Sequence, residues 1–191
     1  MTGYDSRPDT HEHIGAVRGL LLDACIELLG RSHRHDRSKL VEPELSIFNE
    51  FTPKLRDSTY GSDEYKQFLV QMGEGLKHHY AHNAHHPEHW KDGIHGMTLV
   101  DLLEMLVDWK AATMRHADGD LDRSITINRE RFGYGDEIEG LLRLTARHFG
   151  WLSPECTCGW GPPVDLEKFP NGLLDGGHQP GCPKAVRAVR P

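Results

Sequence analysis

A dense run of histidines in the middle of the chain constrains its fold more than any other feature. Six of the fourteen histidines lie between residues 78 and 89. They follow an apolar stripe at helical spacing, formed by Tyr65, Phe68, Met72 and Leu76. Continued along the same helix, the stripe reaches His79, Asn83 and His86, so we expect these side chains to point inward. Pro87 should end the helix, because proline disfavours helical geometry at the residue before it.

Inward-pointing histidines have two interpretations. A lone one is most often a hydrogen-bonded residue of the core. Several in register favour a metal or catalytic site, because neutral imidazole is the commonest protein ligand for transition metals and unpaired polar groups are costly to bury. The number of histidines in this segment favours the second interpretation.

Length and charge narrow the class of protein. The 191 residues suit one helical domain, residues 1–150, followed by a small tail, residues 151–191. The formal net charge of -7 argues against a general nucleic-acid or membrane-surface binder, but it is compatible with a small anionic substrate. No apolar run approaches the length of a membrane span, and the N-terminus lacks the apolar core of a signal peptide, so we expect a cytoplasmic protein.

Helical periodicity predicts an all-α fold of five or six helices, and no alternating pattern indicates a strand. The first helix, residues 11–29, carries an inward stripe of Ile14, Val17, Leu21, Ala24 and Leu28. His13 lies at the edge of this stripe, and Gly30 is a natural stop. We therefore expect the stripe to be buried and His13 to point inward.

Two further segments carry residues suited to binding a metal. The adjacent pair His35 and Asp36 follows the first helix, and together with His13 it could give three ligands to one ion. Lys39 would then lie within a turn of the ion, where it could contact an oxyanion. Asp108 lies in an apolar helix and is costly to bury unless it is paired or ligates a cation. The alternative for Asp108 is a solvated ion pair with a nearby Lys110 or Arg115.

The tail is rich in proline and glycine and has no periodicity. It carries two close pairs of potential ligands, Cys156 with Cys158 and His178 with Cys182. Three thiolates and one imidazole match a structural zinc site, which would order a segment too short to form its own core. The alternative is three free thiols in a disordered tail.

The order of His13, His35, Asp36 and Asp108 resembles the HD superfamily of metal-dependent phosphohydrolases. The strongest resemblance is to an uncharacterised HD-like family of bacteria and phages, whose members share three patterns. Here these are His-Asp-x-Ser-Lys at residues 35–39, His-x-x-x-Asn-x-His-His at 79–86, and Glu-Met-Leu-x-Asp-Trp at 104–109. The resemblance covers about residues 11–115. Some two-metal members of the HD superfamily are cyclic-dinucleotide phosphodiesterases, which carry a Gly-Tyr-Pro signature. This signature is absent here, which argues against cleavage of a cyclic dinucleotide.

The resemblance implies an HD-type helical bundle, an activity and a set of site residues. The first metal would be bound by His13, His35, Asp36 and Asp108, and a second by His79 and His86. Lys39 would stabilise phosphate, and three residues would orient ligands or waters: Asn83, Glu88 and Glu104. One or two divalent ions among manganese, iron, cobalt, nickel and zinc suit such ligands.

The function we expect is therefore metal-dependent hydrolysis of a phosphoester, with a nucleotide as the expected substrate. The competing hypothesis is a non-catalytic interaction or regulatory protein that keeps the metal-stabilised bundle. A phage-encoded regulator is one form of this hypothesis. A nuclease is disfavoured, because surfaces that follow a phosphate backbone are usually basic. The sequence leaves the oligomeric state open.

Overall fold

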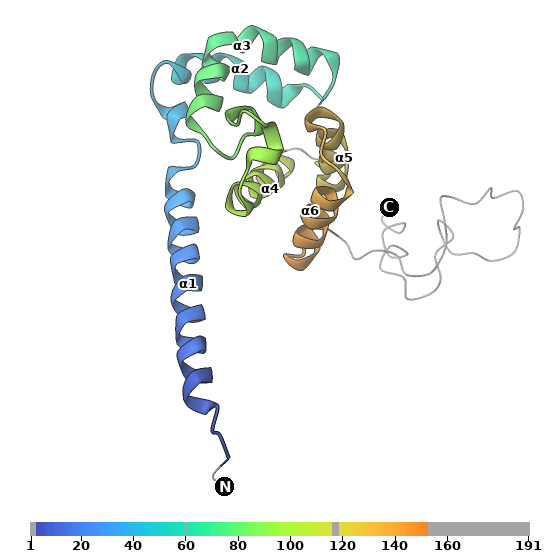
Figure 1. The fold of residues 1–191 in the computed structure, drawn as a ribbon. Coiled ribbons are helices and arrows are strands. Elements are labelled where there is room, and N and C mark those ends of the chain that lie inside the picture. The colour runs from blue at the N-terminus through green and yellow to red at the C-terminus, as the bar shows by residue number, and fades with distance from the viewer. Residues whose placement is uncertain (1–2, 60, 116–118, 153–191) are drawn as a thin grey trace, which may run out of the picture. The chain divides into compact units, whose positions relative to one another are not determined.

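The protein is all-α, as the periodicity predicts (Figure 1). A computed structural model describes residues 3–59, 61–115 and 119–152, and within these ranges it contains six α-helices and no strand. The chain forms two compact units, residues 1–108 and 109–191, with the boundary inside the fourth α-helix. The predicted zinc ligands Cys156, Cys158, His178 and Cys182 lie outside the described residues.

Unit 1 contains three whole α-helices, three short 3-10 helices and most of a fourth α-helix. In chain order these are α1 (Arg7–Arg34), η1 (Arg37–Leu40), α2 (Glu44–Asp57), α3 (Asp63–His82), η2 (Pro87–His89), η3 (Gly93–Gly96) and α4 (Leu99–Thr113). Helices α2 and α3 pack side by side (Figure 1). Phe51, Met72 and Ile94 are buried in this unit.

Helix α3 begins at Asp63 and ends earlier than the sequence predicts. At its start, the Ser62 hydroxyl accepts a hydrogen bond from the Tyr65 N–H, which satisfies one of the free donors of the first turn. The helix ends at His82, not at His86, because Asn83 takes extended geometry and its amide donates to the His79 carbonyl. His86 therefore lies in the loop that follows, together with its neighbour His85.

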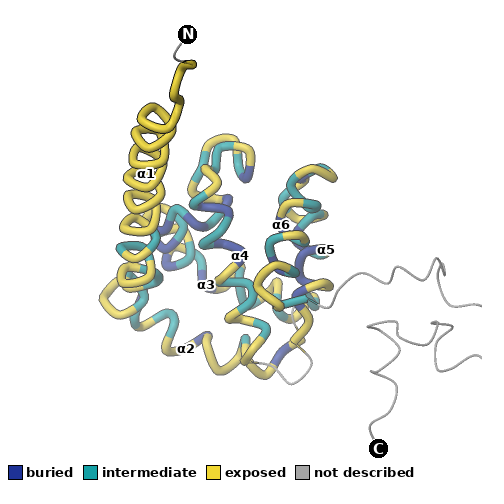
Figure 2. Tube along the Cα trace, turned by 90° about the horizontal axis from the view of Figure 1, so that it is seen from below, coloured by how far each residue is buried: buried dark blue, intermediate teal, exposed yellow. Residues whose placement is uncertain are grey.

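Helix α1 differs most from expectation, because none of its residues is buried (Figure 2). The stripe that contains Ile14 and Val17 forms as one helical face, but that face is exposed. The helix also continues past Gly30 to Arg34. Near this end, Arg31 donates to the buried Asp101 at 2.7 Å, which connects α1 to the start of α4.

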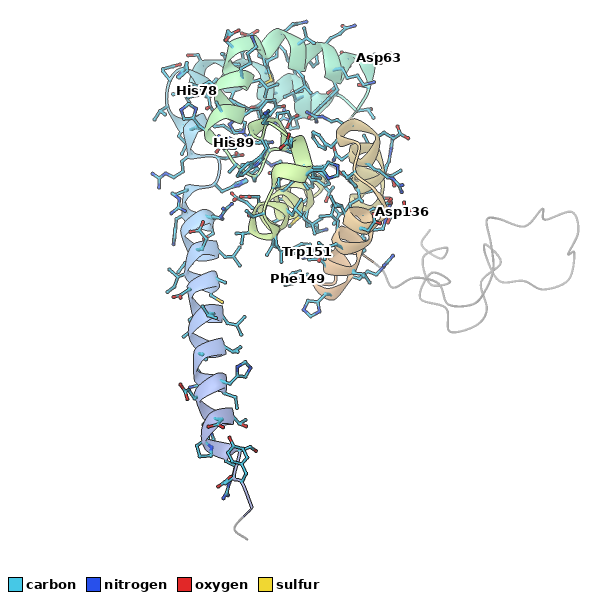
Figure 3. All side chains as sticks on the ribbon, in the orientation of Figure 1. Asp63, His78, His89, Asp136, Phe149 and Trp151 are labelled. Carbon is cyan, nitrogen blue, oxygen red and sulfur yellow. The ribbon has the colours of Figure 1, made fainter. Side chains whose placement is uncertain are left out.

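Unit 2 contains α5 (Leu121–Phe132) and α6 (Asp136–His148), joined by a tight turn at Gly133 with φ of 67°. Positive φ costs glycine nothing, which suits it to this position. Its buried apolar residues are Leu121, Ile125, Tyr134, Leu142 and Ala146. Beyond α6, Phe149 and Trp151 stack at 4.8 Å between ring centroids (Figure 3). Among the described helices, none combines the length and apolar character needed to cross a membrane.

The α2–α3 contact gives a direct test of the packing. A Cβ atom on Gly75 would come within 2.3 Å of the Ile47 Cδ1 and 3.1 Å of its Cγ2. We therefore expect Gly75→Ala to lower the free energy of unfolding by about 1–3 kcal/mol through overpacking. Gly140→Ala in α6 is the matched control, because its Cβ would meet nothing within 4 Å, and it should be neutral or stabilising by about 0.5–1 kcal/mol. Thermal and urea unfolding would measure both, and equal effects would contradict this packing.

Candidate metal centre

The turn after α1 places the first carboxylate of the site. His35 caps the helix, and Asp36 adopts left-handed geometry with φ of 57°. Aspartate tolerates this conformation better than most residues, although it remains uncommon outside glycine. Lys39 holds the turn in two ways, because its backbone N–H donates to the Asp36 carbonyl at 3.0 Å and its ammonium lies 2.5 Å from Asp36 Oδ2. The other carboxylate oxygen, Oδ1, is left to face the histidines.

One group of potential ligands consists of Asp36, His79, His85 and His86. Asp36 Oδ1 lies 3.4 Å from His79 Nε2 and 3.5 Å from His85 Nε2. The two Nε2 atoms of His79 and His86 are 2.9 Å apart. His79 comes from the last turn of α3 and the other two histidines from the loop after it; Figure 3 labels His78 and His89 near the two ends of this segment.

A second group consists of His35, His85 and Asp108, and it shares His85 with the first. His35 Nε2 lies 3.6 Å from Asp108 Oδ1 and 3.6 Å from Asp36 Oδ2. The His35 and His85 rings are in contact, with centroids 4.4 Å apart. Asp108, which the sequence places on an apolar helix, therefore lies beside the histidines and the His35–Asp36 pair.

Two atoms of the cluster test whether a metal fits. Asp36 Oδ1 and His85 Nε2 are buried and have no hydrogen-bond partner. Buried polar atoms are almost always hydrogen-bonded, so two unsatisfied lone pairs 3.5 Å apart call for a third group between them. Ligand atoms about 2.0–2.2 Å from one ion in tetrahedral geometry lie about 3.3–3.6 Å from each other. The Asp36, His79 and His85 distances match this spacing, so these buried groups can hold a metal ion.

Two outer carboxylates orient the imidazoles. Glu44, which is fully buried, accepts from His79 Nδ1 at 2.8 Å. Glu104 accepts from His35 Nδ1 at 2.9 Å and lies 3.4 Å from His85 Nδ1. With Nδ1 occupied in this way, Nε2 of each ring is turned toward the cluster. Metal-binding histidines commonly have this arrangement, because the outer carboxylate fixes the tautomer and raises the basicity of the ligand.

The charges of these groups also suit a cation. Burial raises the pKa of Glu104, but hydrogen bonds from His35, His85 and Arg31 outweigh it and hold that pKa well below its usual range. Burial likewise opposes ionisation of Asp36, yet nearby Lys39 lowers its pKa. Burial lowers the pKa of His79, so this ring is neutral and ready to bind a metal. By contrast, Asp108 and Glu104 raise the pKa of His35 to about 10.

The structure brings together most of the ligands expected from the sequence: His35, Asp36, His79, His86 and Asp108. His13 is not among them. It is exposed and precedes His35 on the same continuous helix by 22 positions, a separation of about 33 Å at 1.5 Å per residue. The expectation for His13 depended on a helix break at Gly30, and α1 has no break there.

The sequence analysis missed two residues of the site, His85 and Glu44. His85 shares both ligand groups, but a helix continued to His86 would have placed it off the inward face. Asn83, which competes with helical geometry, was the available signal that the helix ends first. Glu44 carried no signal, because its role depends on α2 packing beside α3.

The predicted accessory residues take different positions. Asn83 is buried and donates to the Ser38 hydroxyl and to the His79 carbonyl, so it positions a ligand rather than contacting the cluster. Lys39 pairs with Asp36, and Glu104 orients two imidazoles. Glu88 is exposed on η2 and belongs to neither ligand group.

With this geometry established, comparison with known proteins identifies the family. The model of a family of unknown function, DUF5662, matches residues 3–153. The chain belongs to this family. The matched residues include both ligand groups and all six α-helices. The candidate metal centre therefore lies within the region that defines the family. No curated protein and no solved structure matches the chain.

The outer carboxylates predict a measurable loss of metal affinity. Glu104→Gln keeps the shape of the side chain and removes the charge that holds His35 and His85, so affinity should fall by about 10–100-fold. Glu74→Gln, an exposed glutamate of α3, should leave it unchanged. Competition titrations with a chelator would measure both. Equal affinity in the two variants would contradict the orienting role of Glu104.

The raised pKa of His35 predicts a pH dependence. Below about 10 the metal-free ring carries a proton, which an ion bound at Nε2 must displace. Apparent affinity should therefore rise with pH above neutrality, by about tenfold per unit for one proton released. In His35→Asn the proton of this ring is absent, and the first ligand group does not include His35. The slope of affinity against pH should therefore decrease. Binding that does not change with pH in the native protein would exclude His35 as a ligand.

Proposed function

We propose that this protein is a metal-dependent phosphohydrolase whose substrate is a nucleotide or a similar small phosphoester. The observation that carries the proposal is the pair of buried, unpartnered atoms, Asp36 Oδ1 and His85 Nε2, at the junction of two ligand groups. The two groups share His85, whose Nε2 can bind one ion, so a second ion would depend on the other residues of its group. The HD-like order of His35, Asp36 and Asp108 supports the same assignment.

The donor set limits the metal. Imidazole nitrogens and carboxylate oxygens together suit manganese, iron, cobalt, nickel or zinc, whereas calcium and magnesium favour all-oxygen sites. When bound, such an ion would activate water for attack on phosphorus and neutralise phosphate oxygens. Four carboxylates surround the site, two in the ligand groups and two outside them, so it is better suited to a cation than to a free anion.

The surrounding residues have separate tasks in this proposal. Lys39 offers the cationic group closest to Asp36, and its ammonium also lies 4.8 Å from the centre of the Phe48 ring. It is about one-third exposed, so it can meet an oxyanion that arrives from solvent. Glu44 and Glu104 keep the imidazoles turned toward the reaction centre, and Arg31 holds Glu104 in place at 3.0 Å.

A second function is favoured by the origin of the ligands. They come from the turn after α1, from α3 with the loop after it, and from α4. An ion shared by these segments would join them, as structural metals do in small domains. The competing proposal is therefore a non-catalytic, metal-stabilised interaction or regulatory protein with the same site.

Turnover and stability distinguish the two functions. The metal-loaded protein should hydrolyse at least one member of a panel of nucleoside mono-, di- and triphosphates and aryl phosphates. Asp108→Asn should lower hydrolysis by orders of magnitude without unfolding the helices, because it removes an anionic ligand and preserves shape. Substrate-independent loss of thermal stability in this variant, with no turnover in the native protein, would favour the structural function.

Lys39 gives a sharper test at saturating metal. Lys39→Met should retain the ion and reduce kcat/KM by about 10²-fold, because a cation that stabilises charge in the transition state is lost. Lys77→Met is the matched control, since this exposed lysine of α3 pairs only with Glu74 among the described contacts. Phosphate release would be followed at several substrate concentrations. Equal activity in both variants would remove Lys39 from the catalytic site.

A further inference from the structure

Helix α1 presents an apolar surface that nothing in its own unit covers. Its 28 residues include none that is buried (Figure 2). Seven large apolar side chains are each at least 39 % exposed: Ile14, Val17, Leu20, Leu21, Leu22, Ile26 and Leu29. A helix that is apolar over so wide a sector is normally buried, and a contiguous exposed patch of this kind marks an interaction site.

The spacing of the apolar residues indicates what covers them. Five positions recur at alternating intervals of three and four: Ile14, Val17, Leu21, Ala24 and Leu28. This average period of 3.5 residues is that of a coiled-coil seam, in which a second helix packs along the first. The period therefore fits a helix as the occupant better than an irregular peptide or a flat protein surface.

The charges of α1 indicate which helix covers its apolar face. At the start of α1, Arg7 pairs with Asp5, and Asp9 and Glu12 follow. In the last turn, Arg31 pairs within its own protomer, which leaves His33 and Arg34. Two copies of α1 side by side in parallel would place like charges together at both ends. In an antiparallel pair, the acidic start of each helix faces the basic end of the other, and the helix dipoles are opposed. The helix is thus complementary to a second copy of itself.

We propose that α1 is a dimerisation helix, which pairs antiparallel with α1 of a second copy of this chain. Such a pair is isologous, so the same residues contribute from both protomers. Leu20, which is 70 % exposed, lies beside the seam and broadens the contact. A standard interface takes about 800 Å² from each partner, an area that a helix about 42 Å long can offer along one face. The inference does not depend on the proposed hydrolase activity.

The mass of the full-length protein in solution tests the dimer. Light scattering after size-exclusion chromatography should give twice the chain mass of 21.6 kDa. Leu21→Glu should give a monomer, since it places a charge in the seam. Val70→Glu changes an equally apolar and more exposed residue of α3, and it should remain a dimer. Circular dichroism should show the same helix content in all three, because neither residue is buried in its own protomer.

A charge exchange tests the orientation. Asp9→Lys combined with Glu12→Lys should weaken the dimer several-fold, because both ends would then be basic. Adding His33→Glu and Arg34→Glu should restore it, since the two ends are complementary again. A monomeric native protein, or a dimer that survives Leu21→Glu, would overturn the proposal. A dimer unaffected by the first charge change would overturn its antiparallel arrangement, and a monomer that binds only a different protein would assign the face to that partner instead.

Discussion

The structure depends on a small volume in which imidazoles and carboxylates meet without enough protein cations to balance them. Four carboxylates, those of Asp36, Glu44, Glu104 and Asp108, surround or support the histidine cluster. Arg31 and Lys39 neutralise part of this charge through direct ion pairs. Buried charge is costly unless it is paired, so a divalent ion between Asp36 and His85 would complete the balance and satisfy two orphan atoms.

Local backbone features bring the ligands of the site together. Asn83 ends α3 one residue after His82, which allows His85 and His86 to turn back toward His79. Asp36 adopts the left-handed conformation that aims its carboxylate at the same point. Arg31 connects the end of α1 to α4 through Asp101 and Glu104, so the segment before the His-Asp pair is anchored where the pair begins. Residues with uncommon geometry often occur at functional sites, where the surrounding contacts maintain it.

Much of this architecture could be predicted from the sequence, because helical periodicity is a local signal. The all-α class follows from spacing and residue type, and the convergence of His35, Asp36, His79 and Asp108 from these together with the HD-like order of the ligands. The errors arise where tertiary contacts decide. Placing His13 in the site requires a helix end at Gly30, whereas α1 continues through Gly30 to Arg34. The stripe of α1 was expected to face its own core, because periodicity identifies an apolar face but not its partner.

The most direct test of the metal centre is X-ray absorption at the edge of the metal that copurifies with a Cys158→Ser variant. This change weakens any zinc site of the tail, whose ligands would include sulfur. The remaining ion should show a first shell of nitrogen and oxygen at about 2.0–2.2 Å with the outer-shell scattering of imidazole, and this signal should disappear in His85→Ala. A sulfur-rich first shell, or an unchanged spectrum in His85→Ala, would contradict a site built on Asp36 and His85.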